Sequence, residues 1–172
     1  MKRNSMLTIG LAAAIAVVAS AAQAQSADKA SQKFIKAAIE GNLAEIDVGK
    51  LAQEKGQSDA VKSYGQMLVN DHTVSNEKAM QVANELGLTP PTGSSIGEKA
   101  TYLKLKVLSG ASFDRAFAKA MVKDHQDDIK EFQKESQKGD AAGQFAKDTL
   151  PTLQKHLQTA QQLTQQTTGS GQ

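Results

Sequence analysis

The sequence predicts an all-α protein built as a bundle of four long helices, with one long crossover that contains a short helix. Apolar residues recur three or four positions apart over four stretches of about 25 residues, which is the period of amphipathic helices. No run of four or more β-branched and aromatic residues alternates with polar ones, so strands are not expected. The turns after the first and third stretches are short, which pairs the stretches as two antiparallel hairpins.

The first hairpin is predicted from residues 27–55 and 60–86. Between them the apolar period is interrupted, and Ser58 is a preferred N-cap residue for the second helix. Gly87 follows that helix, where glycine is common because it adopts the left-handed backbone conformation without steric strain.

The crossover begins at residue 88. Residues 88–97 contain two prolines and two glycines and are predicted to form a loop. A short helix over 98–108 leads to the third long helix, over 112–137, and a tight turn leads to the fourth, over 141–166. Pro151 predicts a kink or a local start inside the fourth helix. This layout is the ferritin-like arrangement, and a plain up-down-up-down bundle is the alternative.

Both ends of the chain are set apart from the bundle. Two basic residues precede an uncharged apolar run over residues 6–22, and Ala22-Gln23-Ala24 fits the small-x-small pattern of a signal peptidase site. We therefore expect a signal peptide over 1–24, cleaved after Ala24, and a bacterial periplasmic location. An uncleaved membrane anchor is the alternative. The expected bundle domain, 31–166, lies between a polar leader, 25–30, and a disordered tail, 167–172.

The composition excludes several classes of protein. Without cysteine, the chain is no disulfide scaffold and has no thiolate ligand or nucleophile. The net charge of +2 comes from Lys2 and Arg3, because the remaining 18 basic residues balance 18 acidic ones. The expected mature protein is formally neutral, so nucleic acid is not expected as a partner. No second apolar span follows, so stable membrane insertion is not expected after cleavage; protein partners and the oligomeric state are left open.

The informative polar residues are those on the predicted buried stripes. The chain has three histidines, His72, His125 and His156, and each lies near the middle of the apolar stripe of a different helix. Glu45 occupies the comparable place on the first helix. Counted from the turns, these groups lie at similar heights within each hairpin, to roughly 4–5 Å. Burying an ionisable group is costly, so the four are expected to compensate one another.

Two interpretations of this cluster remain open. A metal ion would satisfy three imidazoles and one carboxylate together, and the ligand set suits Zn, Cu, Ni or a single Fe. Asp71, Asp124 and Asp128 lie beside the histidines or one turn away and are candidates to orient them, although Asp71 and Asp124 could equally lie at the surface edge. The alternative is a structural network of hydrogen-bonded histidines without metal.

The segments around two histidines share a V-x-D-H pattern, at residues 69–72 and 122–125. With the methionines before them they read MLVNDH and MVKDH, and they resemble the paired motifs of a bacterial family known as domain of unknown function 4142 (DUF4142). That family is also similar in three further segments, FIKAAIEGNLAEI at 34–46, SGASFD at 109–114 and LPTLQKHL at 150–157. The resemblance covers residues 33–163. It implies a ferritin-like four-helix fold in exported or envelope proteins and implies no reaction.

The comparison with di-iron proteins is negative. Ferritin-like di-iron sites use Glu-x-x-His pairs, whereas the residues three positions before the histidines are Val69, Val122 and Leu153. Ferroxidase, iron-storage and di-iron oxygenase activities are therefore not expected. No nucleophile, phosphate loop or catalytic motif indicates an enzyme. The expected protein is an exported, non-catalytic bundle whose physiological role the sequence leaves open, with the three histidines and Glu45 as candidates to bind one transition metal; the alternative is a cofactor-free structural or interaction module of the cell envelope.

Overall fold

The computed structural model describes residues 28–169, so the expected signal peptide and its cleavage site lie outside the described residues. Within that range the chain forms helices and no strand, and no helix is long and apolar enough to cross a bilayer. The all-α prediction is confirmed. The helices are α1 (Lys29–Lys55), α2 (Asp59–Glu85), α3 (Ile96–Lys106), α4 (Gly110–Glu135) and α5 (Ala141–Gly169).

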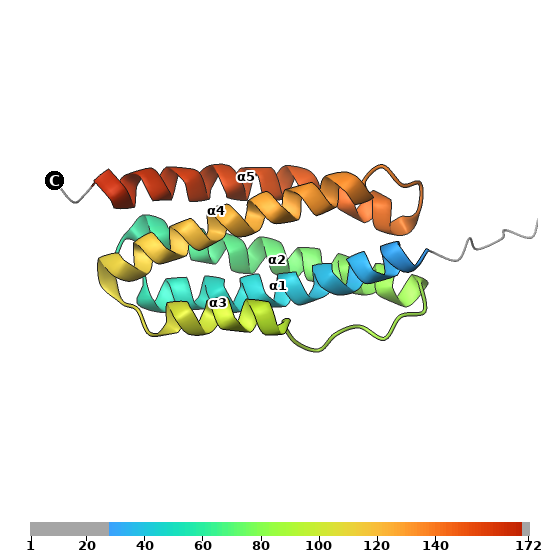
Figure 1. The fold of residues 1–172 in the computed structure, drawn as a ribbon, viewed down its shortest axis with the longest axis horizontal. Helices are drawn as coiled ribbons and strands as arrows, with labels where there is room; N and C mark the ends of the chain where they lie inside the picture. The colour runs from blue at the N-terminus through green and yellow to red at the C-terminus, as the bar shows by residue number, and fades with distance from the viewer. Residues whose placement is uncertain (1–27, 170–172) are drawn as a thin grey trace, which may run out of the picture.

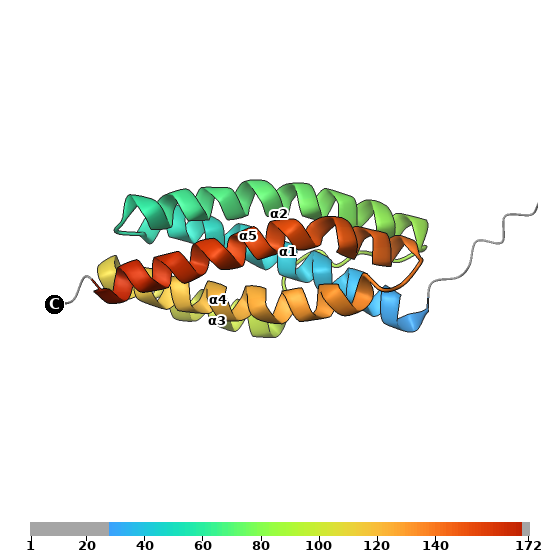
Figure 2. The same ribbon diagram turned by 90° about the horizontal axis from the view of Figure 1, so that it is seen from above.

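The four long helices pack as two hairpins. α1 pairs with α2, and α4 pairs with α5, as Figure 1 shows. α2 ends at the end of the bundle where α1 begins, and the crossover then returns along the bundle, so α2 and α4 run parallel (Figures 1 and 2). The predicted long crossover is confirmed, and the up-down-up-down alternative is wrong because it would make these two helices antiparallel. α3 lies within the crossover and packs against α1 and α4.

Local capping explains where the helices begin and end. The Ser58 hydroxyl accepts a hydrogen bond from Val61 N at 3.3 Å, and Gly87 has φ +65°, as expected for these two positions. α3 begins two residues earlier than predicted because Ser95 and Glu98 form a capping box. Glu98 N donates to Ser95 Oγ at 3.3 Å, and Ser95 N donates to Glu98 Oε2 at 2.6 Å.

α5 departs from the sequence prediction in two respects. It continues to Gly169, so residues 167–169 are helical, although they were expected in the disordered tail. Leu163, one turn before this last part, is buried in the bundle, and the Thr167 hydroxyl donates to Leu163 O within the same helix at 2.8 Å. The helix also continues through Pro151 without a new start. Pro151 is exposed and removes only one backbone donor, which the helix tolerates.

A polar layer divides the apolar core of the bundle. One apolar cluster lies toward the α1–α2 turn and includes Leu68, Met121 and Ala160; the other lies toward the α4–α5 turn and includes Ile129 and Leu153. Each histidine comes between members of the two clusters along its own helix, so the histidines occupy one layer in the middle of the bundle.

α1 and α2 approach each other closely next to this layer. A Cβ on Gly49 would lie 2.7 Å from Gly65 O, and a Cβ on Gly65 would lie 2.6 Å from Gly49 O. Only glycine permits this separation, because any side chain would collide with the facing backbone. The contact lies one turn from Glu45 and sets how near the polar face of α1 comes to α2.

Candidate metal centre

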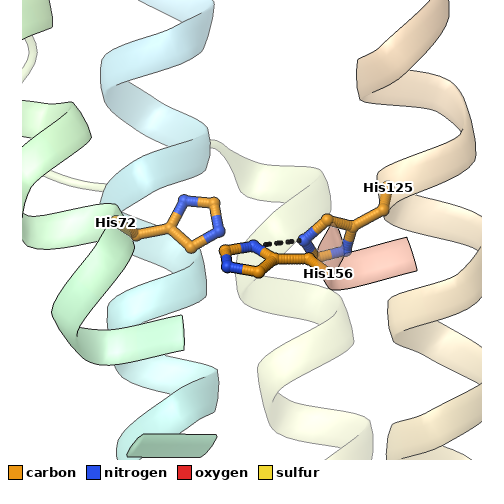
Figure 3. Close-up of side chains that lie close together, drawn as sticks. All are labelled: His72, His125 and His156. Atoms are coloured by element: carbon orange, nitrogen blue, oxygen red, sulfur yellow. Dashed lines mark hydrogen bonds between the residues drawn. The ribbon is translucent and has the colours of Figure 1, made fainter. Parts of the chain in front are cut away.

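The three histidines converge in the middle of the bundle. His72 of α2, His125 of α4 and His156 of α5 point toward one another (Figure 3). One ring nitrogen from each lies within 4.8 Å of the other two. The ring centroid of His156 lies 5.2 Å from that of His72 and 5.2 Å from that of His125. All three side chains are buried, with at most 4% of their surface exposed.

Each imidazole has one nitrogen that faces a hydrogen-bond acceptor. His125 Nδ1 lies 3.0 Å from Met121 O, and His156 Nε2 lies 2.8 Å from Asp71 Oδ2. His72 Nδ1 lies 2.9 Å from Asn42 Oδ1. An acceptor fixes the N–H on the nitrogen that it faces, which leaves the lone pair of a neutral ring on the other nitrogen.

The remaining nitrogens are the ones that converge. His125 Nε2 and His156 Nδ1 are 3.2 Å apart. His72 Nε2 is buried without a hydrogen-bond partner. In Figure 3 this nitrogen, the one farther from the backbone, is directed toward the other two rings. Two imidazole nitrogens bound to one tetrahedral ion, each about 2.0–2.1 Å from it, lie about 3.3 Å apart. The separation of His125 and His156 therefore suits two ligands of one ion as well as it suits a hydrogen bond.

Burial keeps the three rings neutral. Burial and the nearby His156 together lower the pKa of His125 to about 4, and burial with the two neighbouring histidines lowers the pKa of His72 well below its usual value. Burial also lowers the pKa of His156, although the hydrogen bond to Asp71 opposes that effect. Near pH 7 the cluster is a set of neutral imidazoles, which is the form that binds metal ions.

Two neutral rings do not carry enough protons for all the hydrogen bonds around them. Three contacts follow one another: Met121 O to His125, His125 to His156, and His156 to Asp71, and each of them needs one N–H. Two neutral imidazoles supply only two. Either this series of contacts gains one proton, or His125 Nε2 and His156 Nδ1 share something other than a proton. A metal ion between the two lone pairs meets this need.

Glu45 is not part of the histidine group. The potential ligand atoms that lie within 4.8 Å of one another belong to the three imidazoles. Its side chain is 2% exposed, and neither carboxylate oxygen has a hydrogen-bond donor. Burial is the main cause that raises the pKa of Glu45 well above its usual value, and the charge of Asp124 adds to the effect. The folded state therefore favours the protonated form of Glu45.

The three aspartates near the histidines have different roles. Asp71 bonds His156 on another helix rather than its sequence neighbour. Asp124 is exposed and lies beside Glu45. Asp128 is half-buried, and burial and the nearby carboxylates raise its pKa. Only Asp71 hydrogen-bonds a histidine among the three.

Two neighbours of the histidines were not predicted. Asn42 orients His72, and the Tyr64 hydroxyl donates to His156 O at 3.0 Å. The sequence offered a signal for Asn42, because it lies three residues before Glu45 and therefore on the same helical face. A search limited to ionisable groups passes over an amide. The Met121 carbonyl has no signal of its own, since every residue carries that group.

The comparisons with known proteins agree with the fold. The sequence model of the family described as domain of unknown function (DUF4142) matches residues 16–163. No curated protein matches the chain. A crystal structure of a DUF305 fragment from Deinococcus radiodurans is similar, with a TM-score of 0.73 and 14% sequence identity, over 81% of this chain and 98% of that one. At this identity the likeness concerns the fold alone, a helical ferritin-like bundle.

Proposed function

The chain belongs to the family of domain of unknown function 4142, and from that premise we propose that it binds one transition-metal ion through His72, His125 and His156, with Glu45 as the fourth ligand. One observation carries the proposal. Three buried imidazoles each face an acceptor with one nitrogen, and their other nitrogens converge without enough protons to bond one another. Acceptors behind ligating histidines are the usual way in which proteins orient them.

The donor set limits the metal. Imidazole nitrogens suit Zn, Cu, Ni and Fe, and a chain without cysteine offers no thiolate to favour softer ions. Three protein ligands leave a fourth position on a tetrahedral ion. Glu45 is the candidate for this position because it is buried without a donor, and it would have to release its proton and rotate toward the histidines.

We also propose that the protein works outside the cytoplasm. The support is the basic, apolar and small-residue pattern of residues 1–24. Its test is the intact mass of the protein recovered from a periplasmic extract of a bacterial host. Cleavage after Ala24 gives a chain that begins at Gln25, whereas retention as an anchor gives the full mass in the membrane fraction.

A cofactor-free module of the envelope is the second candidate. The observation that favours it is the 3.2 Å contact between His125 and His156, which can be an N–H···N hydrogen bond. That reading needs one extra proton on the pair or on Asp71. It predicts that histidine substitutions change stability and nothing else.

Elemental analysis separates the two candidates. The mature protein is purified without chelator, offered Zn, Cu, Ni and Fe in turn, and compared with a variant in which His72, His125 and His156 are all replaced by Gln. Ser31→Ala is the matched control, because Ser31 is buried and polar but lies in the polar network at the α4–α5 turn. We expect one ion per chain in the wild type and the control, and none in the triple variant.

Two results would contradict the proposal. One is a wild-type protein that binds no stoichiometric metal with all four ions offered. The other is an equal metal content in the folded triple variant, which would move the site away from the histidines.

A further inference from the structure

A cavity of about 150 Å³ reaches the histidine layer from the side of the bundle that α3 covers. Its wall includes His72 and Asn42, and it also includes the carboxylates of Glu98, Asp128 and Glu131. We call it the acidic cavity. Glu98, which belongs to α3, also lines a neighbouring cavity of about 210 Å³ together with Glu45 and Asp124. The cavities therefore meet at one carboxylate between α1, α3 and α4.

The walls of both cavities carry negative charge and no positive charge. No lysine or arginine lines either one within the described residues. Burial, together with the charges of Asp124 and Glu98, raises the pKa of Asp128 to about 8, so this carboxyl is mostly protonated near pH 7 and adds little to the negative charge. Negative side chains in a recess with apolar walls raise the local concentration of cations and speed their arrival.

The inner wall of the acidic cavity includes an atom that lacks a partner. His72 lines the cavity, is 4% exposed, and has its Nε2 buried without a hydrogen bond. This nitrogen is one of the three proposed ligands. Asp71, whose carboxylate is bonded to His156, does not line the acidic cavity. The cavity is thus lined by carboxylates and by the proposed ligand residue that has an unpartnered nitrogen.

We propose that the acidic cavity is the access path by which a hydrated divalent cation reaches the three histidines, with Glu98 and Glu131 as the groups that draw it in. The inference rests on the proposed metal site and adds how the site is loaded and in which chemical form. The path takes up the free aqua cation. It disfavours metal held in an anionic chelate, because the same carboxylates repel a negative complex.

The size of the cavity suits this role. A volume of about 150 Å³ corresponds to roughly five water molecules at ~30 Å³ each, so a cation can enter with part of its water shell. Carboxylate oxygens can replace some of these waters before the imidazoles bind the ion. The ion would first contact carboxylate oxygens, which are hard ligands, and then bind imidazole nitrogens, which are softer and suit transition metals better.

Stopped-flow absorbance with aqueous Co²⁺ tests the path, since tetrahedral Co²⁺ gives visible bands on binding. The variant is Glu98→Gln with Glu131→Gln; Gln at position 98 preserves the capping box with Ser95. The matched control is Asp127→Asn, one turn before Glu131 but outside the cavity wall and paired with Lys123 and Lys130. At low salt we expect the association rate to fall about tenfold in the double variant and to stay within about twofold in the control.

A second variant adds bulk without changing charge. Ala37 is exposed and lines the acidic cavity, so Ala37→Phe narrows its mouth. We expect association and dissociation to slow together, with the equilibrium affinity for Co²⁺ unchanged, which is the behaviour of a narrowed path rather than an altered site. If circular dichroism shows that the double variant does not fold, the Ala37→Phe measurement tests the access path by itself.

The outcomes separate the two proposals. If Co²⁺ binds the wild type, but the charge variant and Ala37→Phe both load at the wild-type rate, the access path is wrong and the metal site stands. If the wild type takes up no Co²⁺, Zn²⁺, Cu²⁺, Ni²⁺ or Fe²⁺ at equilibrium, the metal site fails and the path fails with it. Equal loading from aqua Co²⁺ and from an anionic Co²⁺ chelate would overturn the assigned chemical form.

Discussion

Polar side chains are buried both at the ends of the bundle and in its middle, and the two regions differ in how these groups are satisfied. Near the α4–α5 turn, the buried Ser31 hydroxyl donates to Glu135 at 2.6 Å and accepts from Lys138 Nζ at 3.0 Å. Lys138 also pairs with Glu135 Oε2 at 3.0 Å. Near the α1–α2 turn, Asp114 accepts from the backbone N–H groups of Gln57 and Ser58, each at 2.9 Å.

The middle layer is built differently. Buried atoms lack hydrogen-bond partners there on Asn42 (Nδ2), Glu45 (both oxygens) and His72 (Nε2), and one turn further along α2 on Ser75 and Asn76. Buried polar groups in folded proteins are nearly always hydrogen-bonded, so an unsatisfied group needs an explanation. The ends use polar groups to hold helices together. The middle holds buried groups that have no hydrogen-bond partner within the described residues, which is why we place function there.

The largest effect is expected at the satisfied end. Asp114→Ala removes the acceptor of two backbone N–H groups, and hydrogen bonds to a charged group are worth about 1.5–3 kcal/mol each, so we expect a loss of about 3 kcal/mol in the free energy of unfolding. Urea titration measures it. Asp114→Asn keeps one acceptor and should lose less. A loss no greater than that of the exposed Asp127→Asn would remove the contrast between the two regions.

Adding metal should convert the middle into a satisfied region. With free Zn²⁺ at 100 times its dissociation constant, we expect the unfolding free energy to rise by about 2.7 kcal/mol. Asp71→Asn should weaken binding by about 10- to 100-fold, since an aspartate that orients a ligating histidine contributes that much. Its Zn²⁺-dependent gain should shrink accordingly. Thermal unfolding with and without Zn²⁺ is the measurement, and an equal gain for Asp71→Asn would contradict the orienting role.

The smallest effect has the opposite sign from the first. Because burial raises the pKa of Glu45, the folded metal-free protein keeps a proton that the unfolded chain releases above the usual carboxyl pKa. The contribution of Glu45 to stability therefore falls as the pH rises. Glu45→Gln does not titrate and should gain about 1 kcal/mol over the wild type at pH 8 and less at pH 5.

The end of the bundle supplies the control for this prediction. Glu135 has donors in Ser31 and Lys138, so Glu135→Gln should destabilise the protein at both pH values. Measurements are made on metal-free protein by urea titration. If Glu45→Gln were also destabilising at pH 8, Glu45 would have a donor in the folded state, and the middle layer would resemble the ends.

The sequence predicted much of this molecule from local signals. The apolar period located four long helices, Ser58 and Gly87 marked helix ends, and the unequal connections predicted the crossover. The positions of the histidines on their stripes predicted that they would be buried. The start of α3 was misplaced although its capping box, Ser95 to Glu98, can be read in the sequence. The helical end of α5 was missed because residues 167–169 are not apolar and carry no helical period.

Tertiary structure alone decided the chemistry of the site. Periodicity gives the face on which a residue lies, but not the rotation of one helix against the next or the torsion angles of its side chain. Those angles bring Asp71 to His156 on another helix rather than to a neighbour in sequence, and they turn Asn42 toward His72. They also put Glu45 beside Asp124 and outside the group of imidazoles. Hydrogen-bond partners depend on differences of about an ångström. Helical spacing fixes positions only to within a turn.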